Sequence, residues 1–155
     1  MSFASLLNEG QVVVGFAAKD KPQAIAGLVD VLAAVGRLTP PQRAAAVDAL
    51  LAREKIGSTG LEHGIALPHA IVDIPGEALA VLAVSRDGVA FQAADGAPSR
   101  LLVLLLVPRR AVQKHLRTLA EVARLLDRPD VRESLLKAKS AKDALEIVRA
   151  AETGG

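Results

Sequence analysis

The most constraining feature of this 155-residue sequence is an unbroken aliphatic run, Leu101–Val107, in which every residue is Leu or Val. A helix that crosses a bilayer needs about 20 apolar residues, so this run is far too short to span a membrane. A short apolar run of this kind is typical of a buried strand. We therefore expect a chain that is not membrane-embedded, with this run as one strand of its core.

Helical segments are indicated by their capping residues. Asp20 is a favourable N-cap, and Pro22 follows it in the first turn, where the missing N–H of proline is tolerated. Thr39 precedes Pro40 in the same way, and Ser140 caps a final helix. Apolar residues then recur at helical spacing after each cap. Helices are predicted over 21–35, 40–53, 112–126, 129–138 and 141–151.

The remaining apolar runs are short and are separated by turn-forming residues such as Arg86–Gly88 and Asp95–Gly96. Strands are predicted over 12–16, 65–67, 78–84, 89–91 and 101–107. Helices and strands alternate without an intervening linker or internal repeat. We therefore expect residues 1–155 to form a single α/β domain with one continuous core.

Composition argues against several classes of function. The chain has no cysteine, which removes disulfides, thiolate metal sites and cysteine nucleophiles. Its net charge is only +2 and its aromatic residues are three Phe, so a nucleic-acid partner is not expected. The absence of cysteine and of a signal-peptide pattern at the N-terminus predicts a cytoplasmic protein.

Familiar catalytic motifs are absent as well. The sequence contains no phosphate-binding Walker loop, no Gly-x-Ser-x-Gly elbow and no His-Glu-x-x-His zinc helix. His63 and His69 are poorly spaced to share a metal on one helix face. Neither a metal nor a cofactor is expected, and a metal-dependent hydrolase lacks the necessary ligand clusters.

His69 is the residue best placed for chemistry. It follows the apolar segment 65–67 and Pro68, so it is expected at the end of a strand. Proline fixes its own φ and biases the preceding residue to an extended conformation, which restricts where the imidazole points. A neutral imidazole is a good phosphoryl acceptor near pH 7, and the phosphoramidate that it forms can pass the group on. Residue pattern alone also allows an ordinary surface or core histidine.

Transfer of a phosphoryl group needs in-line approach and positive charge around its oxygens more than it needs further covalent chemistry. A second donor near the nucleophile would fix the tautomer of its ring or bond the phosphoryl oxygens. By residue type, His115 and Arg53 are the candidates. Composition alone does not bring them close to His69.

Three segments together resemble a known family: 53–55 (Arg-Glu-Lys), 57–60 (Gly-Ser-Thr-Gly) and 64–70 (Gly-Ile-Ala-Leu-Pro-His-Ala). They are similar to the enzyme IIA domain of the fructose–mannitol type, which belongs to the bacterial phosphoenolpyruvate-dependent phosphotransferase system and includes a nitrogen-regulatory form. The similarity continues through Phe91, the Asp95–Gly96 turn and the stretch around His115, so it covers nearly the whole chain.

The resemblance implies a fold, a site and partners. The family fold is a mixed β-sheet with helices on both faces, which gives a three-layer domain. His69 matches the histidine that the family phosphorylates, with the phosphocarrier protein HPr or its nitrogen-branch equivalent as donor. His115 matches the second active-site histidine and Arg53 the active-site arginine, both of which lie beside the phosphorylated ring in the family.

The chain departs from the family pattern at Glu62, where a small residue is usual. A carboxylate there would slow transfer if it faced the phosphoryl group, but we expect it to point to solvent. The next residue, His63, is expected to be an exposed loop residue.

Two functions remain within the family. A nitrogen-type regulator acts through its phosphorylation state, which changes the target proteins that it binds. A sugar-transport IIA component passes the group to a IIB partner. We favour the regulator because the family resemblance is strongest there. A domain that binds partners without being phosphorylated is the further alternative, and the presence of His69, His115 and Arg53 argues against it.

Overall fold

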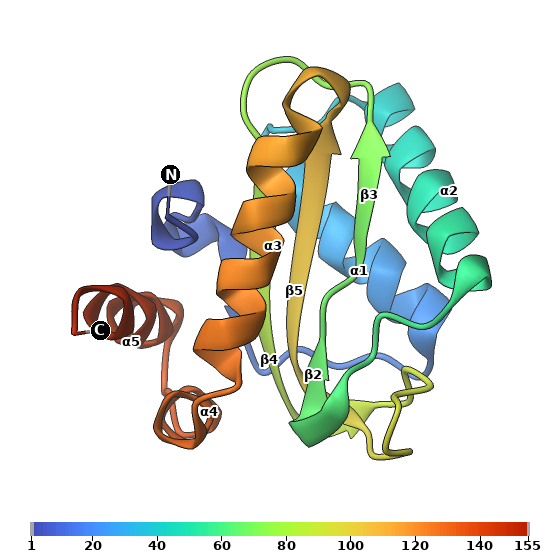
Figure 1. The fold of residues 1–155 in the computed structure, drawn as a ribbon. Helices are drawn as coiled ribbons and strands as arrows, with labels where there is room; N and C mark the ends of the chain where they lie inside the picture. The colour runs from blue at the N-terminus through green and yellow to red at the C-terminus, as the bar shows by residue number, and fades with distance from the viewer. Residues whose placement is uncertain (1, 155) are drawn as a thin grey trace.

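The computed structural model describes residues 2–154, which form a layered α/β fold (Figure 1). Its strands are β1 (Val12–Val14), β2 (Ile65–Ala66), β3 (His69–Val72), β4 (Leu79–Val89) and β5 (Ser99–Pro108). Its α-helices are α1 (Lys21–Ala34), α2 (Pro40–Ile56), α3 (Val112–Leu126), α4 (Pro129–Leu136) and α5 (Ala141–Thr153). Short 3-10 helices are η1 (Ala4–Leu6), η2 (Glu9–Gln11), η3 (Glu62–Gly64) and η4 (Arg109–Ala111).

The sheet has the strand order β1-β4-β5-β2, and β3 also pairs with β5. β4 runs antiparallel to β5, whereas β2 and β3 run parallel to β5 and β1 runs parallel to β4. The sheet is therefore mixed, as the family resemblance predicted. β2 and β3 follow one another along the same side of β5, because Ile65 is opposite Leu101 and His69 is opposite Leu105.

Helices cover both faces of this sheet, which confirms the three-layer prediction (Figure 1). One face packs against α3, α4, α5 and η1, and the other packs against α1 and α2. The predicted buried strand is β5, whose side chains alternate between the two cores. Leu101, Val103 and Leu105 enter the first core, and Leu102 and Leu104 enter the second.

The helix caps behave as predicted. The Asp20 carboxylate accepts the Gln23 N–H at 3.0 Å, and the Ser140 hydroxyl accepts the Asp143 N–H at 3.1 Å. Thr39 and Gln42 form a reciprocal capping box at the start of α2. The helices begin where predicted, and α3 also ends there; the other C-terminal ends differ by one to three residues, with α2 continuing to Ile56.

One strand was missed and one predicted turn was wrong. The segment 69–72 forms a strand that was not predicted, β3, so His69 lies at a strand end as expected, but as the first residue of β3. The turn expected at 86–88 does not reverse the chain. Instead, β4 continues through these residues with a shift in register between Val84 and Val89. Such an irregularity keeps the strand paired while extra residues are accommodated on one side.

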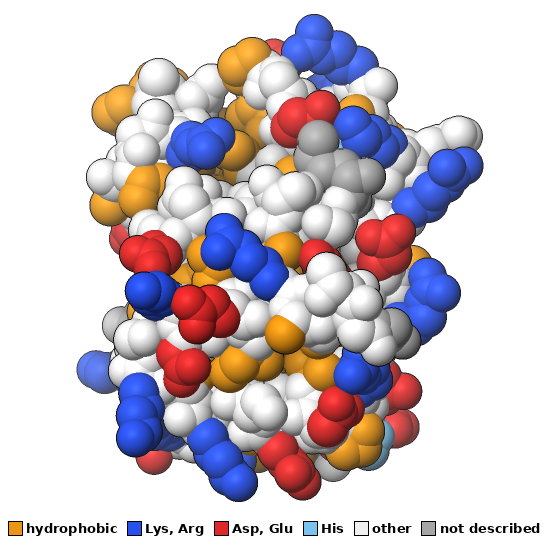
Figure 2. Space-filling model, turned by 90° about the vertical axis from the view of Figure 1, so that its left-hand side faces the viewer, with side chains coloured by type: hydrophobic (Ala, Val, Ile, Leu, Met, Phe, Trp, Pro, Cys, Tyr) orange, Lys and Arg blue, Asp and Glu red, His pale blue; other side chains and the backbone are white. Residues whose placement is uncertain are grey.

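Among the described residues, no helix is long and apolar enough to cross a membrane. The face shown in Figure 2 carries Lys and Arg side chains interspersed with Asp and Glu. This mixture of charge agrees with the low net charge of the chain.

Candidate functional site

An open pocket lies where the last turn of α2, the loop after it, the start of β3 and one side of α3 meet. His69 and Arg53 both line it. Its described lining residues are Arg53, Ser58, Thr59, Leu61, Leu67, His69, Leu116, Leu119, Ala120 and Ala123. The structure therefore brings together two of the three residues singled out from the sequence.

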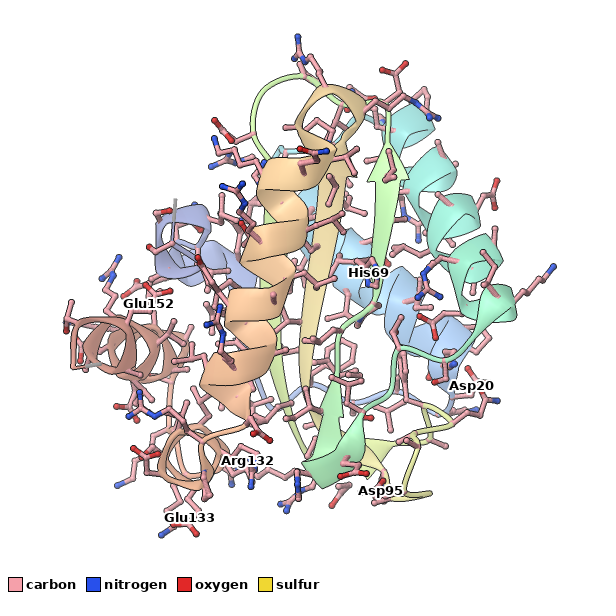
Figure 3. The ribbon with its side chains drawn as sticks, in the orientation of Figure 1. Asp20, His69, Asp95, Arg132, Glu133 and Glu152 are labelled. Carbon is pink, nitrogen blue, oxygen red and sulfur yellow. The ribbon has the colours of Figure 1, made fainter. Side chains whose placement is uncertain are left out.

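The position of His69 is set by the central strand of the sheet. The Leu105 N–H donates to the Pro68 carbonyl at 3.0 Å, and His69 lies opposite Leu105 in the parallel register. Ala70, which follows, points into the core beneath α1 and α2, so the alternation of a strand turns the imidazole to the opposite face, on the side of α3. In Figure 3 His69 lies at the start of β3, between α3 and the C-terminal end of α2.

The ring of His69 has a defined hydrogen-bond partner. Its Nδ1 lies 2.8 Å from the carbonyl oxygen of Leu67. A carbonyl oxygen only accepts hydrogen bonds, so this contact requires Nδ1 to carry the proton. In the neutral ring the lone pair is then on Nε2. The local backbone thus selects the nitrogen that is available as a nucleophile.

Arg53 is in the last turn of α2. Its Nη1 donates to the Gly57 carbonyl at 2.9 Å, which ties the guanidinium to the chain just beyond the helix. This acceptor is neutral, so the positive charge of Arg53 is not consumed by a carboxylate there. A guanidinium at the pocket wall is suited to bind an anion through several N–H groups at once.

The loop between α2 and η3 is held by Glu54. The Glu54 Oε1 accepts the Thr59 N–H at 3.0 Å, and its Oε2 accepts a short hydrogen bond from the Thr59 hydroxyl. Ser58 donates from its hydroxyl to the Phe91 carbonyl at 2.6 Å. The Arg-Glu and Gly-Ser-Thr-Gly segments therefore form one unit, in which Arg53 faces the pocket and Glu54 anchors the loop.

Sequence reasoning missed Lys21, in the first turn of α1. Its Nζ is 2.8 Å from Glu54 Oε1 and 3.2 Å from Ser58 Oγ, and it lies 4.8 Å from the centroid of the Phe91 ring. The Lys21 and Glu54 side chains are only 8% and 5% exposed. No local pattern marks Lys21, because its partners lie more than thirty positions later in the chain.

His115 is placed differently from the other two site candidates. Its side chain is fully buried beneath α3, and its Nε2 is 3.4 Å from Glu77 Oε2. Burial lowers the pKa of His115 below its usual value, although the Glu77 carboxylate opposes that shift. His115 is not among the described lining residues of the pocket. From this turn of α3, the next residue, Leu116, lines the pocket instead.

Glu62 and His63 lie on an exposed turn. Their side chains are 67% and 53% exposed, and Glu62 does not belong to the described lining of the pocket. The His63 N–H donates to Asp95 Oδ2 at 3.2 Å. Together with the Ala97 N–H, which has the larger effect, that bond lowers the pKa of Asp95. The solvent-facing position expected for Glu62 is therefore what the structure shows.

Over residues 2–154, no cluster of three or more His, Cys, Asp or Glu residues is positioned to hold a metal ion.

Comparison with known proteins assigns this chain to one family. Residues 5–151 match the family model for EIIA 2 of the phosphoenolpyruvate-dependent sugar phosphotransferase system. The fructose-specific EIIA component of Haloferax volcanii is 38% identical over 128 residues, which is 83% of this chain and 82% of the relative. A nitrogen regulatory protein of Pseudomonas aeruginosa is 42% identical over 105 residues, which is 68% of each chain.

Solved structures of IIA proteins have a fold similar to that of this chain. The nitrogen regulatory protein IIA-Ntr of Neisseria meningitidis superimposes with a TM-score of 0.84 at 31% identity, over 94% of this chain and 97% of that one. The IIA mannitol structure from Escherichia coli has a TM-score of 0.74 at 26% identity, over 92% and 98% of the two chains.

Proposed function

Because this chain belongs to the EIIA type 2 family of the phosphoenolpyruvate-dependent sugar phosphotransferase system, we propose that it carries a phosphoryl group on Nε2 of His69. One observation carries the assignment of the atom: His69 lines the pocket with Nδ1 held by the Leu67 carbonyl, which leaves Nε2 free. The protein acts as a phosphocarrier of this system.

The transfer step follows from that arrangement. The Nε2 lone pair attacks phosphorus in line with the bond to the donor, a new N–P bond forms, and the donor departs with the electron pair of the broken bond. His69 keeps its Nδ1 proton, and the Leu67 carbonyl stabilises the positive charge that develops on the ring. Arg53, at the wall of the same pocket, neutralises charge on the equatorial oxygens.

His115 has a supporting role in this proposal. It does not contribute to the described pocket lining, but it lies on α3, one side of which forms a wall of the pocket. With both ring nitrogens lacking a hydrogen bond of good geometry, it has a donor to offer once α3 or the Glu77 loop adjusts around a phosphoryl group.

The surroundings of the pocket suit a protein donor. Leu61 and Leu116 line it and are 38% and 52% exposed, and Ile71, two positions along β3 from His69, is 46% exposed. Exposed apolar side chains around a reactive group favour docking of another protein. HPr or its nitrogen-branch equivalent is the donor that the family implies.

The downstream role that we favour is regulation. The nitrogen regulatory relatives and IIA-Ntr support it, and a phosphoryl group at His69 would change the charge of a surface that partners contact. The fructose-specific relative and the IIA mannitol structure support the second candidate, transfer to a IIB component of a sugar transporter.

Phosphorylation is tested by mixing the protein with phosphoenolpyruvate, enzyme I and HPr, and measuring intact mass. We expect an acid-labile phosphoryl adduct on the wild type and on His63→Ala, and none on His69→Ala. An adduct on His69→Ala would show that the site is wrong. No adduct on the wild type, with a donor pair active on another acceptor, would favour a binding module that is not phosphorylated.

The two downstream roles are separated by giving the phosphorylated protein to a IIB component. Rapid loss of the group to IIB would support the sugar-transport role. Retention of the group, with a target protein captured by only one of the two phosphorylation states, would support the regulator.

A further inference from the structure

The ion pair between Lys21 and Glu54 is buried next to the pocket and joins the start of α1 to the end of α2. Both charges have been removed from water, which is unfavourable unless the pair is well bonded. Here each group has further partners: Lys21 bonds Ser58 Oγ, and Glu54 bonds Thr59 through its backbone N–H and its hydroxyl. The pair is thus the anchor of the 57–60 loop.

A continuous series of hydrogen bonds leads from this anchor to His69. Glu54 holds Thr59, and the Thr59 carbonyl accepts the Leu67 N–H at 3.1 Å. The Leu67 carbonyl in turn accepts the Nδ1 proton of His69 at 2.8 Å. Each link is a direct hydrogen bond, and the series crosses from α2 through the loop to β3.

Leu67 is the link on which the ring depends. It lies between β2, which ends at Ala66, and β3, which begins at His69, so neither strand ladder includes it. Its backbone is therefore held chiefly by Thr59 on one side and by the extended geometry that precedes Pro68. If Thr59 moved, the Leu67 carbonyl that fixes the tautomer of His69 would lose one of these two supports.

We infer that Lys21, Glu54 and Thr59 are positioning residues for the phosphoryl acceptor: the buried pair holds Thr59, and Thr59 holds the Leu67 carbonyl that keeps the proton on Nδ1 of His69. This inference rests on the proposed function. None of the three side chains needs to touch the phosphoryl group, because they act through the orientation of the ring.

Two variants test the series at different links. Lys21→Met removes the cation while keeping an unbranched side chain, and Thr59→Val removes the hydroxyl that Glu54 accepts. Thr59→Ser is the conservative control for Thr59→Val, since it keeps a hydroxyl at this position. Arg43→Met is the matched control for the ion pair, because Arg43 Nε also joins α2 to α1, through Asp30 at 2.5 Å, without contact to the loop.

Two measurements are made on each folded variant, with folding checked by circular dichroism. In single-turnover phosphoryl transfer from phospho-HPr, we expect Lys21→Met and Thr59→Val to lower the rate at saturating donor by about tenfold, because a loss of orientation acts on the reacting geometry. The half-saturating donor concentration should change less than about twofold. In ¹⁵N spectra of the His69 ring we expect the same variants to mix the two neutral tautomers. Arg43→Met and Thr59→Ser are expected to resemble the wild type.

Wild-type transfer rates and wild-type ring signals in both test variants would overturn the inference. Equal slowing by Arg43→Met, or a change confined to the half-saturating donor concentration, would also overturn it, because the effect would then be general stability or donor docking. If Lys21→Met does not fold, Thr59→Val decides. If the wild type accepts no phosphoryl group, the proposed function fails, and the ring spectra still decide whether the buried pair sets the tautomer.

Discussion

The His69 ring donates its Nδ1 proton to the carbonyl oxygen of Leu67, only two residues earlier in the chain. The intervening Pro68 makes this short return possible, since it restricts both its own backbone and that of Leu67. The direct partner of the ring nitrogen is thus a neutral carbonyl, and under the proposed function Nδ1 stays protonated before and after transfer.

The first prediction concerns the phosphorylated atom. We expect the adduct at Nε2 of His69, because Nδ1 is occupied by its hydrogen bond to Leu67. Nitrogen chemical shifts and nitrogen–phosphorus couplings in ¹⁵N-labelled protein distinguish the two isomers. A phosphoryl group found on Nδ1 would mean that this hydrogen bond breaks before transfer.

The second prediction concerns Arg53. Arg53→Ala should slow transfer from phospho-HPr roughly a hundredfold, in the range seen when one preorganised donor is removed from an active site. Lys55→Ala is the control, because it removes a cation from the same last turn of α2 without altering the described lining of the pocket. Equal slowing by both variants would assign the effect to overall charge and would remove Arg53 from the step.

The third prediction concerns the loop beside the pocket. A Cβ added at Gly60 would lie 2.9 Å from the Phe91 carbonyl oxygen and 2.9 Å from the Ala93 Cα, both backbone atoms that cannot rotate away. Gly60→Ala should therefore lower the free energy of unfolding by about 1–3 kcal/mol.

Gly57→Ala is the matched control for Gly60. A Cβ there meets nothing within 4 Å, and the φ of 172° is extended backbone that any residue adopts. We expect a change within about 0.5 kcal/mol. Denaturant titration followed by circular dichroism measures both variants, and similar losses in the two would contradict the packing argument.

The fourth prediction concerns pH. Burial lowers the pKa of His115 in the folded protein, whereas the unfolded chain has the usual value of 6.5. The unfolded state therefore binds more protons below about that pH, so the contribution of His115 to stability is present above it and is lost as the pH falls towards the folded pKa. The thermal midpoint of the wild type should fall more between pH 7.5 and 5.5 than that of His115→Leu.

The comparison isolates His115 because both proteins keep His63, His69 and every carboxylate. Lys114 lowers the pKa of the Glu77 carboxyl, and removal of His115 takes away a smaller effect of the same sign. Its titration lies below the usual carboxyl value, outside the pH window used. An equal or larger fall in His115→Leu would show that the buried ring does not gain a proton on unfolding in this range.

Local chemistry explains why much of the fold could be predicted. The Asp20, Thr39 and Ser140 caps are determined by residues within one turn, and each forms the expected side-chain bond. The 101–107 run could be identified as buried because it is apolar throughout. The mixture of parallel and antiparallel strands depends on pairing between distant segments, and it was predicted only from the family resemblance.

The parts that were missed depend on distant partners. β3 has only four residues, directly after a proline, and it exists because β5 offers a free side to pair with. Lys21 is a residue type that is almost never buried without a partner, and its partner Glu54 is thirty-three positions away. Likewise, nothing in the sequence around His115 shows that it faces the core while Leu116 faces the pocket.

The two outer margins of the sheet are built from its shortest strands, with three residues in β1, two in β2 and four in β3. Long open margins act as templates on which other chains add strands and aggregate. Here Pro68 also interrupts the margin that carries His69, and proline has no N–H to offer. A phosphocarrier must be approached repeatedly by other proteins. Under the proposed function, this chain can therefore present His69 at the border of a sheet without recruiting the strands of its partners.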